Sequence, residues 1–130
     1  MKKEAIRHPK VYALAERLNV SRPTVLGHLQ LLWDFVEDHA IQGDVGKWPD
    51  GAISRACEWM GSAAEFVTAL VESGWLDSHP LHRLVVHDWQ DHCQTWVRAK
   101  LAKRGLPFLC QNPTIEPTIE PTIEPTIEPT

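Results

Sequence analysis

One long apolar segment constrains the fold of this chain more than any other feature. Seven apolar residues recur with the period of a helix over residues 22–40: Val25, Leu26, Leu29, Leu32, Trp33, Val36 and Ala40. They form two adjacent stripes, and an apolar face of that width has to be covered on most sides. Ser21 is a suitable N-cap, and Pro23 fits the first turn. We therefore predict a central helix over residues 22–40.

Shorter elements are predicted on both sides of this helix. His8 and Pro9 open a first helix, which carries one apolar stripe and stops near Asn19. Residues 42–48 contain two glycines and predict a turn followed by a very short extended piece. Asp50 is expected to cap a third helix of about two turns.

The second half of the domain combines helices with a hairpin. Ser62 caps a fourth helix, with Glu65 in capping-box spacing, and Gly74 ends it. Residues 75–89 change to the pattern of two short strands around the turn SHPLHR. A last helix is expected over residues 90–103. The predicted fold class is mainly α with a small β-hairpin, in the order of a winged helix-turn-helix domain with an extra helix at each end.

The chain divides into one domain and a repetitive tail. Residues 1–110 are enough for one core, whereas residues 111–130 form a tail in which the unit PTIE repeats from position 113 onward. A proline at every fourth position denies both a helix and a sheet ladder, so we predict an extended, disordered tail. Such a repeat is either an expansion of simple sequence without a role or a stiff acidic spacer.

The cysteines and the apolar runs indicate a cytoplasmic protein. Cys57, Cys93 and Cys110 form no CxxC pair, which is typical of unpaired thiols in a reducing compartment. No run approaches the ~20 apolar residues of a membrane span. The basic N-terminus MKKEAIRHPK is not followed by an apolar segment, so it does not resemble a secretory signal. We therefore expect no contact with a membrane.

Charge is distributed unevenly along the chain, whose net charge is −4. Residues 1–22 carry six bases against two acids, and residues 98–104 carry four bases and no acid. Residues 34–91, in contrast, carry three bases against eleven acids. If the two basic ends lie together, they form a phosphate-binding patch; the alternative is an ordinary solvated surface.

Two helices are candidates for entering a DNA groove, and neither has a convincing reading face. The central helix offers Arg22, Thr24 and His28 at its start, but its exposed side then becomes acidic. The fourth helix contains two acids and no base. The sequence does not choose between them, so we expect phosphate contacts to outweigh base contacts. The predicted DNA-binding residues are Lys10, Arg22, Thr24, His28, His82, Arg83, Arg98, Lys100, Lys103 and Arg104.

Enzymatic and metal chemistry are not predicted. The stretch HDWQDHC places Asp88 and His92 on one helix face, but a closed zinc site needs four ligands, and no second cluster has ligand spacing. The chain has no GxSxG elbow, no Walker A loop and no GxGxxG motif. We therefore expect a protein that is not an enzyme and that holds neither a metal ion nor a cofactor.

Tryptophans offer a second route to nucleic acid, because aromatic side chains stack on the bases of single strands. The chain has six of them. Trp33 and Trp75 fall at inward-pointing positions of their elements and are assigned to the core. Trp48 and Trp96 lie at the edges of predicted elements, where the pattern leaves both core packing and base stacking open.

Several blocks of the sequence resemble a known family. They are His8-Pro9-Lys10, Gly27-His28-Leu29, Leu32-Trp33, the stretch VESGWL and His87-Asp88-Trp89. Over residues 6–104 the chain resembles the N-terminal winged-helix domain of phage and prophage replication-initiation proteins, the replisome-organiser or DnaD-like class. The resemblance implies a role in DNA replication or in a related DNA-binding process, in which this domain binds origin DNA or drives self-assembly. The family usually continues into a second domain, whereas the PTIE tail follows here, so a truncated initiator is one interpretation.

These observations lead to one functional prediction and two alternatives. The prediction is a DNA-binding winged-helix protein of a phage or mobile element, which acts in the initiation or control of replication. The first alternative is a protein-interaction or self-assembly module without DNA binding of its own, whose partner is a replication protein or a second copy of the chain. The second alternative is a remnant that retains no activity.

Overall fold

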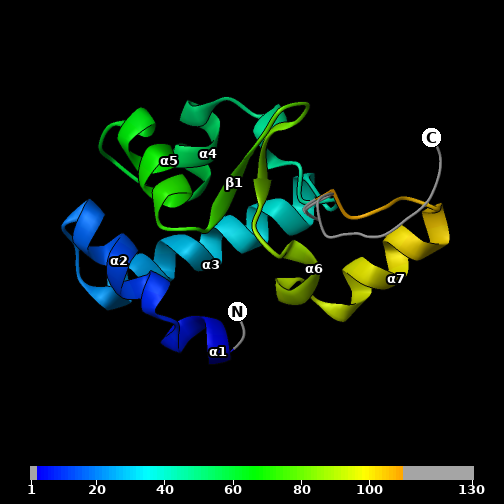
Figure 1. The fold of residues 1–130 in the computed structure, drawn as a ribbon, viewed down its shortest axis with the longest axis horizontal. Coiled ribbons are helices and arrows are strands. Elements are labelled where there is room, and N and C mark those ends of the chain that lie inside the picture. Colours follow the sequence, from blue (N-terminus) through cyan, green and yellow to red (C-terminus); the bar gives the residue numbers. More distant parts are fainter. Residues whose placement is uncertain (1–2, 110–130) are drawn as a thin grey trace.

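The structure is built around one long central helix, as predicted. The computed structural model describes residues 3–109. Helix α3 (Arg22–His39) crosses the molecule, with α2 (Pro9–Leu18) at one of its ends and α7 (Thr95–Arg104) at the other (Figure 1). Five of the seven residues of the predicted stripes are its buried side chains: Val25, Leu29, Leu32, Trp33 and Val36. Leu26 is only partly buried, and Ala40 is buried just after the helix ends. The wide apolar face of α3 therefore packs against other parts of the protein along most of the helix.

Local side-chain chemistry sets the starts of the main helices. Ser21 Oγ accepts a hydrogen bond from the Thr24 amide at 3.4 Å and so caps α3. Ser62 caps α5 (Ala63–Glu72) in the same way, with the Glu65 amide as donor at 3.2 Å. Both predicted N-caps are confirmed.

Two helix starts differ from the prediction. A short helix, α1 (Lys3–Arg7), precedes α2 and buries Ala5. The two helices are separate because His8 has an extended backbone and its side chain accepts a hydrogen bond from the Lys10 amide. Helix α4 (Asp50–Ala56) has Pro49 as its N-cap, so the prediction that Asp50 caps it is wrong by one position.

The predicted last helix is divided in two. Helix α6 (Trp89–His92) ends at Cys93, and α7 begins after Gln94. The break arises because Cys93 and Gln94 both have extended backbone conformations, with ψ of 160° and 155°. Trp89 and Val97 are fully buried on the two sides of this break, so the change of direction lets both helices face the core.

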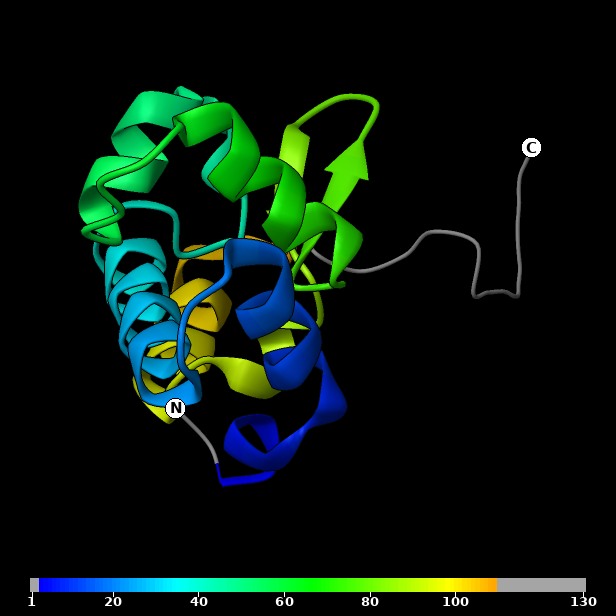
Figure 2. The same cartoon turned by 90° about the vertical axis from the view of Figure 1, so that its left-hand side faces the viewer.

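Within residues 3–109 the strands form a single two-stranded antiparallel sheet. Strand β1 (Leu76–His79) pairs with β2 (Arg83–Val86), with Leu76 opposite Val86. The sheet lies beside α5 and above α6 (Figures 1 and 2). Together with the seven α-helices of the described residues, it confirms the prediction of a mainly α fold with a small β-hairpin.

The segment after α3 forms a short 3-10 helix, η1 (Val45–Lys47), so the prediction of an extended piece is wrong. The Trp48 amide donates to the Val45 carbonyl at 3.0 Å and closes this turn. The segment lies against β2, since the Val86 amide donates to the Gly43 carbonyl at 2.9 Å. A Cβ atom on Gly46 would lie 2.3 Å from the Leu84 amide nitrogen, so the backbones meet where no side chain fits.

Tryptophans occupy the middle of the core. The ring centroid of Trp33 lies 5.7 Å from that of Trp75 and 6.1 Å from that of Trp89. All three rings are at most 2% exposed, which confirms that Trp33 and Trp75 belong to the core. No helix in the described part of the chain combines the length and apolarity needed to cross a bilayer. The predicted disordered tail and Cys110 lie outside the described residues.

Candidate nucleic-acid interface

Helix α7 carries four of the predicted DNA-binding residues: Arg98, Lys100, Lys103 and Arg104. All four side chains are exposed. The helix packs on the protein through Val97 and Leu101, which are its buried residues. No acidic residue occurs between positions 92 and 109. The outer side of α7 is therefore a cationic surface, on which only Arg98 has a carboxylate within ion-pair distance among the described residues, that of Asp91 at 4.0 Å.

The four cations of α7 are not equally available. The Arg98 guanidinium donates to the Gln90 carbonyl and lies 5.6 Å from the Phe108 ring centroid. The remaining three stand away from carboxylates: within residues 3–109, no acidic side chain lies within ion-pair distance of them. These three residues are Lys100, Lys103 and Arg104. They are the cations best placed to contact phosphates.

Arg22 and Thr24 form a second and smaller group at the start of α3. The Arg22 guanidinium lies 5.7 Å from the Tyr12 ring centroid and donates to the Tyr12 hydroxyl at 3.1 Å. Thr24 Oγ1 lies 2.9 Å from Ser21 Oγ. Arg22, Thr24 and Tyr12 are all exposed.

Lys10 and His28, two other predicted contacts, are engaged within the fold. Lys10 Nζ donates to the Gly74 carbonyl at 2.7 Å and lies 5.0 Å from the Trp75 ring centroid. Burial lowers the pKa of Lys10, although the nearby carboxylates of Asp88 and Asp77 oppose that shift. The His28 Nδ1 atom lies 2.6 Å from the Cys57 carbonyl oxygen. Both side chains therefore link helices to segments that are remote in sequence.

The hairpin turn contains His82 and Arg83. Both the Leu81 and His82 amides donate to His79 Nδ1 at 3.0 Å, which fixes the turn. Arg83 has a left-handed φ of 67° and binds back into the protein. Its guanidinium donates to the Trp48 carbonyl at 2.6 Å and to the Asp50 carboxylate at 2.7 Å. These hydrogen bonds of the Arg83 guanidinium therefore go to the segment that joins η1 to the start of α4.

The basic helices from the two ends of the sequence, α2 and α7, do not lie side by side. Figure 1 shows α2 beside one end of α3 and α7 beside the other, and Figure 2 shows α2 in front with α7 behind. The condition for a single phosphate-binding patch is therefore not met. The basic surface of α7 has to be considered by itself.

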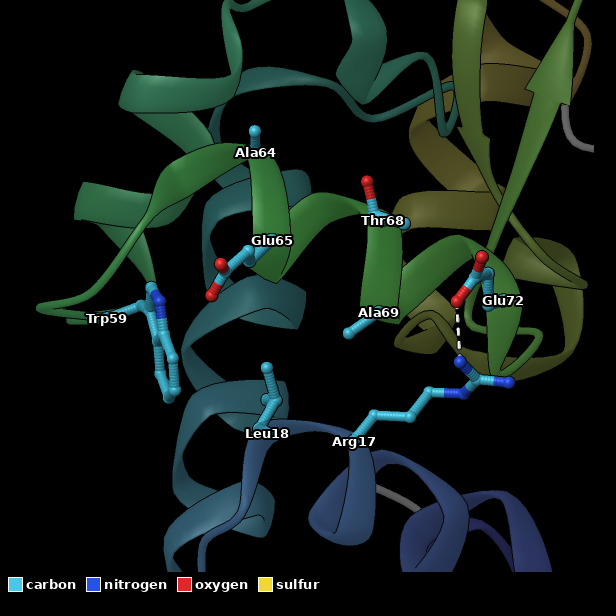
Figure 3. A pocket seen from close by; sticks show the side chains of 8 residues that line it. All are labelled: Arg17, Leu18, Trp59, Ala64, Glu65, Thr68, Ala69 and Glu72. Atoms are coloured by element: carbon cyan, nitrogen blue, oxygen red, sulfur yellow. Dashed lines mark hydrogen bonds and ion pairs between the residues drawn. The ribbon is translucent and has the colours of Figure 1, made fainter.

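The acidic middle of the sequence contributes to a groove beside α5. Figure 3 shows this groove, with Trp59 at one end and the 2.5 Å ion pair between Arg17 and Glu72 at the other. Its volume is about 480 Å³, and its lining consists of Arg17, Leu18, Trp59, Ala64, Glu65, Thr68, Ala69 and Glu72. Leu18 and Trp59 add apolar atoms to a lining whose charged groups are Glu65 and the Arg17–Glu72 ion pair. Because Arg17 offsets one of the two carboxylates, the lining keeps one net negative charge, which suits a basic segment with an apolar anchor better than a phosphate.

Two aromatic side chains on these surfaces, Trp96 and Tyr12, are largely exposed. Trp96 is 45% exposed and Tyr12 is 55% exposed. A signal for Trp96 was present, because Val97 and Leu101 define the buried stripe of α7 and Trp96 falls outside it. The groove had no such signal, because Arg17 and Leu18 are remote in sequence from the α5 residues that they face.

Comparison with known proteins adds no assignment to this geometry. No family model, no curated protein and no solved structure matches the chain.

Proposed function

We propose that this protein binds DNA through the phosphate backbone, with α7 as the principal contact surface. The observation that carries the proposal is a helix with four exposed cations in a stretch without any acidic residue. Cations held on a rigid helix release condensed counterions from DNA when they contact phosphates, and this release drives association. Such contacts position a protein on DNA but read little sequence.

The order of the elements supports a winged-helix interpretation of the same proposal. Helices α3, α4 and α5 are followed by the β1–β2 hairpin, and the η1 segment lies beside β2. In that arrangement α5 takes the place of the recognition helix and the hairpin takes the place of the wing. The role that we propose, initiation or control of replication in a phage or mobile element, comes from the sequence resemblance described above.

The charges on α5 make it an unfavourable surface for phosphate contact. The helix has Glu65 and Glu72 on its accessible side and carries no base. A duplex would be repelled from that side, so we assign the main contact to α7. Arg22 and Thr24 are placed to add a weaker contact at the start of α3.

The proposal is tested by fluorescence anisotropy of the full chain with a labelled duplex, between about 50 and 200 mM salt. The decisive variant replaces Lys100, Lys103 and Arg104 together with Gln. It should weaken binding at low salt by at least tenfold, and the slope of log K against log[salt] should fall by about 0.9 for each phosphate that the variant no longer neutralises. Arg98 is kept, since it also contacts Gln90 and Phe108.

A matched control separates a specific surface from net charge. Replacing the exposed residues Arg7, Lys47 and Arg55 with Gln removes the same total charge from other parts of the surface. This control should change affinity by less than threefold. Equal losses in the two variants, or no binding of the wild type at the lowest salt, would contradict the proposal.

A second candidate function, self-assembly, is favoured by the groove beside α5. We infer that its occupant would be α7 of a second copy, because that helix presents an exposed Trp96 beside several cations. The groove offers the complementary features, which are the apolar atoms of Leu18 and Trp59 and the carboxylate of Glu65. The two surfaces differ, so copies would join head to tail.

Sedimentation velocity of the full chain over a range of micromolar concentrations tests this second candidate. Self-assembly predicts a sedimentation coefficient that rises with concentration and that falls to the monomer value in both Glu65→Lys and Trp96→Ala. A monomer at every concentration would rule it out, and so would an assembly that neither variant weakens.

A further inference from the structure

We propose that Trp96 stacks on an unpaired base, so that the α7 surface prefers single-stranded DNA to a duplex. The inference deepens the proposed function and rests on it. One tryptophan differs from the others in its exposure to solvent. Trp33, Trp75 and Trp89 are at most 2% exposed, whereas Trp96 is 45% exposed.

The position of Trp96 on α7 is fixed by its neighbours in sequence. Val97 and Leu101, four residues apart, are buried and set the orientation of the helix. Trp96 precedes Val97 and is therefore rotated by about 100° away from the buried stripe. The indole is consequently held by a rigid, anchored backbone and directed toward solvent.

Cations flank this ring on the same side of the helix. Lys100 Nζ lies 5.8 Å from the Trp96 ring centroid. Trp96, Lys100 and Lys103 follow one another at intervals of four and three residues, so they lie in a row about 10 Å long. An aromatic ring in line with cations is the arrangement by which proteins hold single strands, since the base stacks and the phosphates contact the cations.

Trp96, and not the lysines, should distinguish single-stranded DNA from a duplex. In a duplex each base face is covered by its neighbours in the stack, so an outside ring finds no face to contact. Phosphates are accessible in both forms, and the cations therefore contribute to both. The ratio of single-strand to duplex affinity should depend on Trp96, whereas the salt dependence should depend on Lys100, Lys103 and Arg104.

The test measures affinities of the full chain for labelled oligo-dT of ~12 nucleotides, which forms no duplex, and for a mixed-sequence duplex. Trp96→Ala should weaken oligo-dT binding by about tenfold and duplex binding by less than twofold. Trp96→Phe, which keeps an aromatic ring, should retain most of the oligo-dT affinity.

Tyr12→Ala is the matched control, because Tyr12 is a comparably exposed aromatic residue beside a cation, Arg22, at the other end of α3. Loss of its contact with Arg22 affects phosphate binding in both ligands alike, so the ratio of the two affinities should stay unchanged. The inference is overturned if Trp96→Ala weakens both ligands equally or neither, or if Tyr12→Ala produces the selective loss. Duplex binding that persists in those cases leaves the proposed function standing, whereas a wild type that binds neither ligand at low salt ends both.

Discussion

Helices α5 and α7 are both ten residues long, but they differ in burial and in charge. Helix α5 buries Phe66, Val67, Ala69 and Leu70 and contacts α2, α4 and β1. Helix α7 buries only Val97 and Leu101. Helix α5 carries two acids and no base, whereas α7 carries four bases and no acid.

The difference shows that a helix's place in the fold and its suitability for a ligand are separate properties. A helix covered on several sides has few positions left for Lys and Arg, which are almost never fully buried. A helix attached along one narrow stripe leaves most of its positions free for charge. The element order directs attention to α5, but the exposed chemistry directs it to α7.

The largest expected effect concerns the reactivity of two buried thiols, one near each helix. Cys57 lies at the end of α4, which packs against α5, and burial raises its pKa to about 12. Ordinary thiols have a pKa near 8.5, so at pH 8 the thiolate population of Cys57 is roughly three orders of magnitude lower. Alkylation of folded protein at pH 8 should be slower than that of urea-unfolded protein by at least this factor.

Cys93 provides the comparison, because it lies two residues before α7 and is also buried. Local opening of the narrowly attached α7 should expose it more often than Cys57 is exposed. Mass spectrometry of two variants, Cys93→Ser with Cys110→Ser and Cys57→Ala with Cys110→Ser, follows each thiol by itself. Faster alkylation of Cys57 than of Cys93 would mean that α5 is the less firmly held helix.

The next effect compares one leucine in each helix. Leu70 in α5 is 0% exposed and Leu101 in α7 is 1% exposed. Leu70→Ala should lower the free energy of unfolding by about 4 kcal/mol, because the cavity is enclosed on several sides. Leu101→Ala should lower it by about 2 kcal/mol, because α7 can shift to fill the space. Urea unfolding with equal m-values provides the measurement, and equal losses would show that the two helices are equally well packed.

The smallest effect comes from reversing one charge on α5. Glu65→Lys should strengthen duplex binding at low salt by a few fold, since it removes a repulsion and adds a cation at the groove. Asp38→Lys makes the same change of net charge on the exposed side of α3 and should have less effect. An equal gain in both variants would mean that total charge, and not the α5 surface, limits DNA affinity.

Features set by local interactions could be predicted from the sequence. Ser21 and Ser62 cap the helices that follow them, because the accepting hydroxyl and the donating amide are three residues apart. The burial of Trp33 followed from helical period, since one stripe of α3 faces the core along its whole length. In these cases the interacting groups are close in sequence.

Features that depend on contacts between residues remote in sequence could not be predicted. Arg83 was expected to contact phosphate, but its hydrogen-bond partners Trp48 and Asp50 lie more than thirty residues away. The same holds for Lys10, whose ammonium group binds the Gly74 carbonyl across 64 positions. The division between α6 and α7 depends on the joint burial of Trp89 and Val97, and no local signal indicates it. A sequence shows how many cationic side chains there are, but the fold determines which of them are left to bind phosphate.

The backbone contact at Gly46 also indicates how descent from a common ancestor would be recognised. Alanine there would place its Cβ 2.3 Å from the Leu84 amide nitrogen and 2.4 Å from the His82 carbonyl oxygen. Leucine, isoleucine and methionine in a core can exchange for one another because volume is nearly conserved, and exposed lysines are replaced with little effect on stability. Gly46 lies against the backbone of residues 82–84 and therefore cannot be replaced by a residue that has a side chain. Among distant sequences of similar length, glycine at this position, two residues before a tryptophan, would be a more durable mark of kinship than any of the apolar stripes.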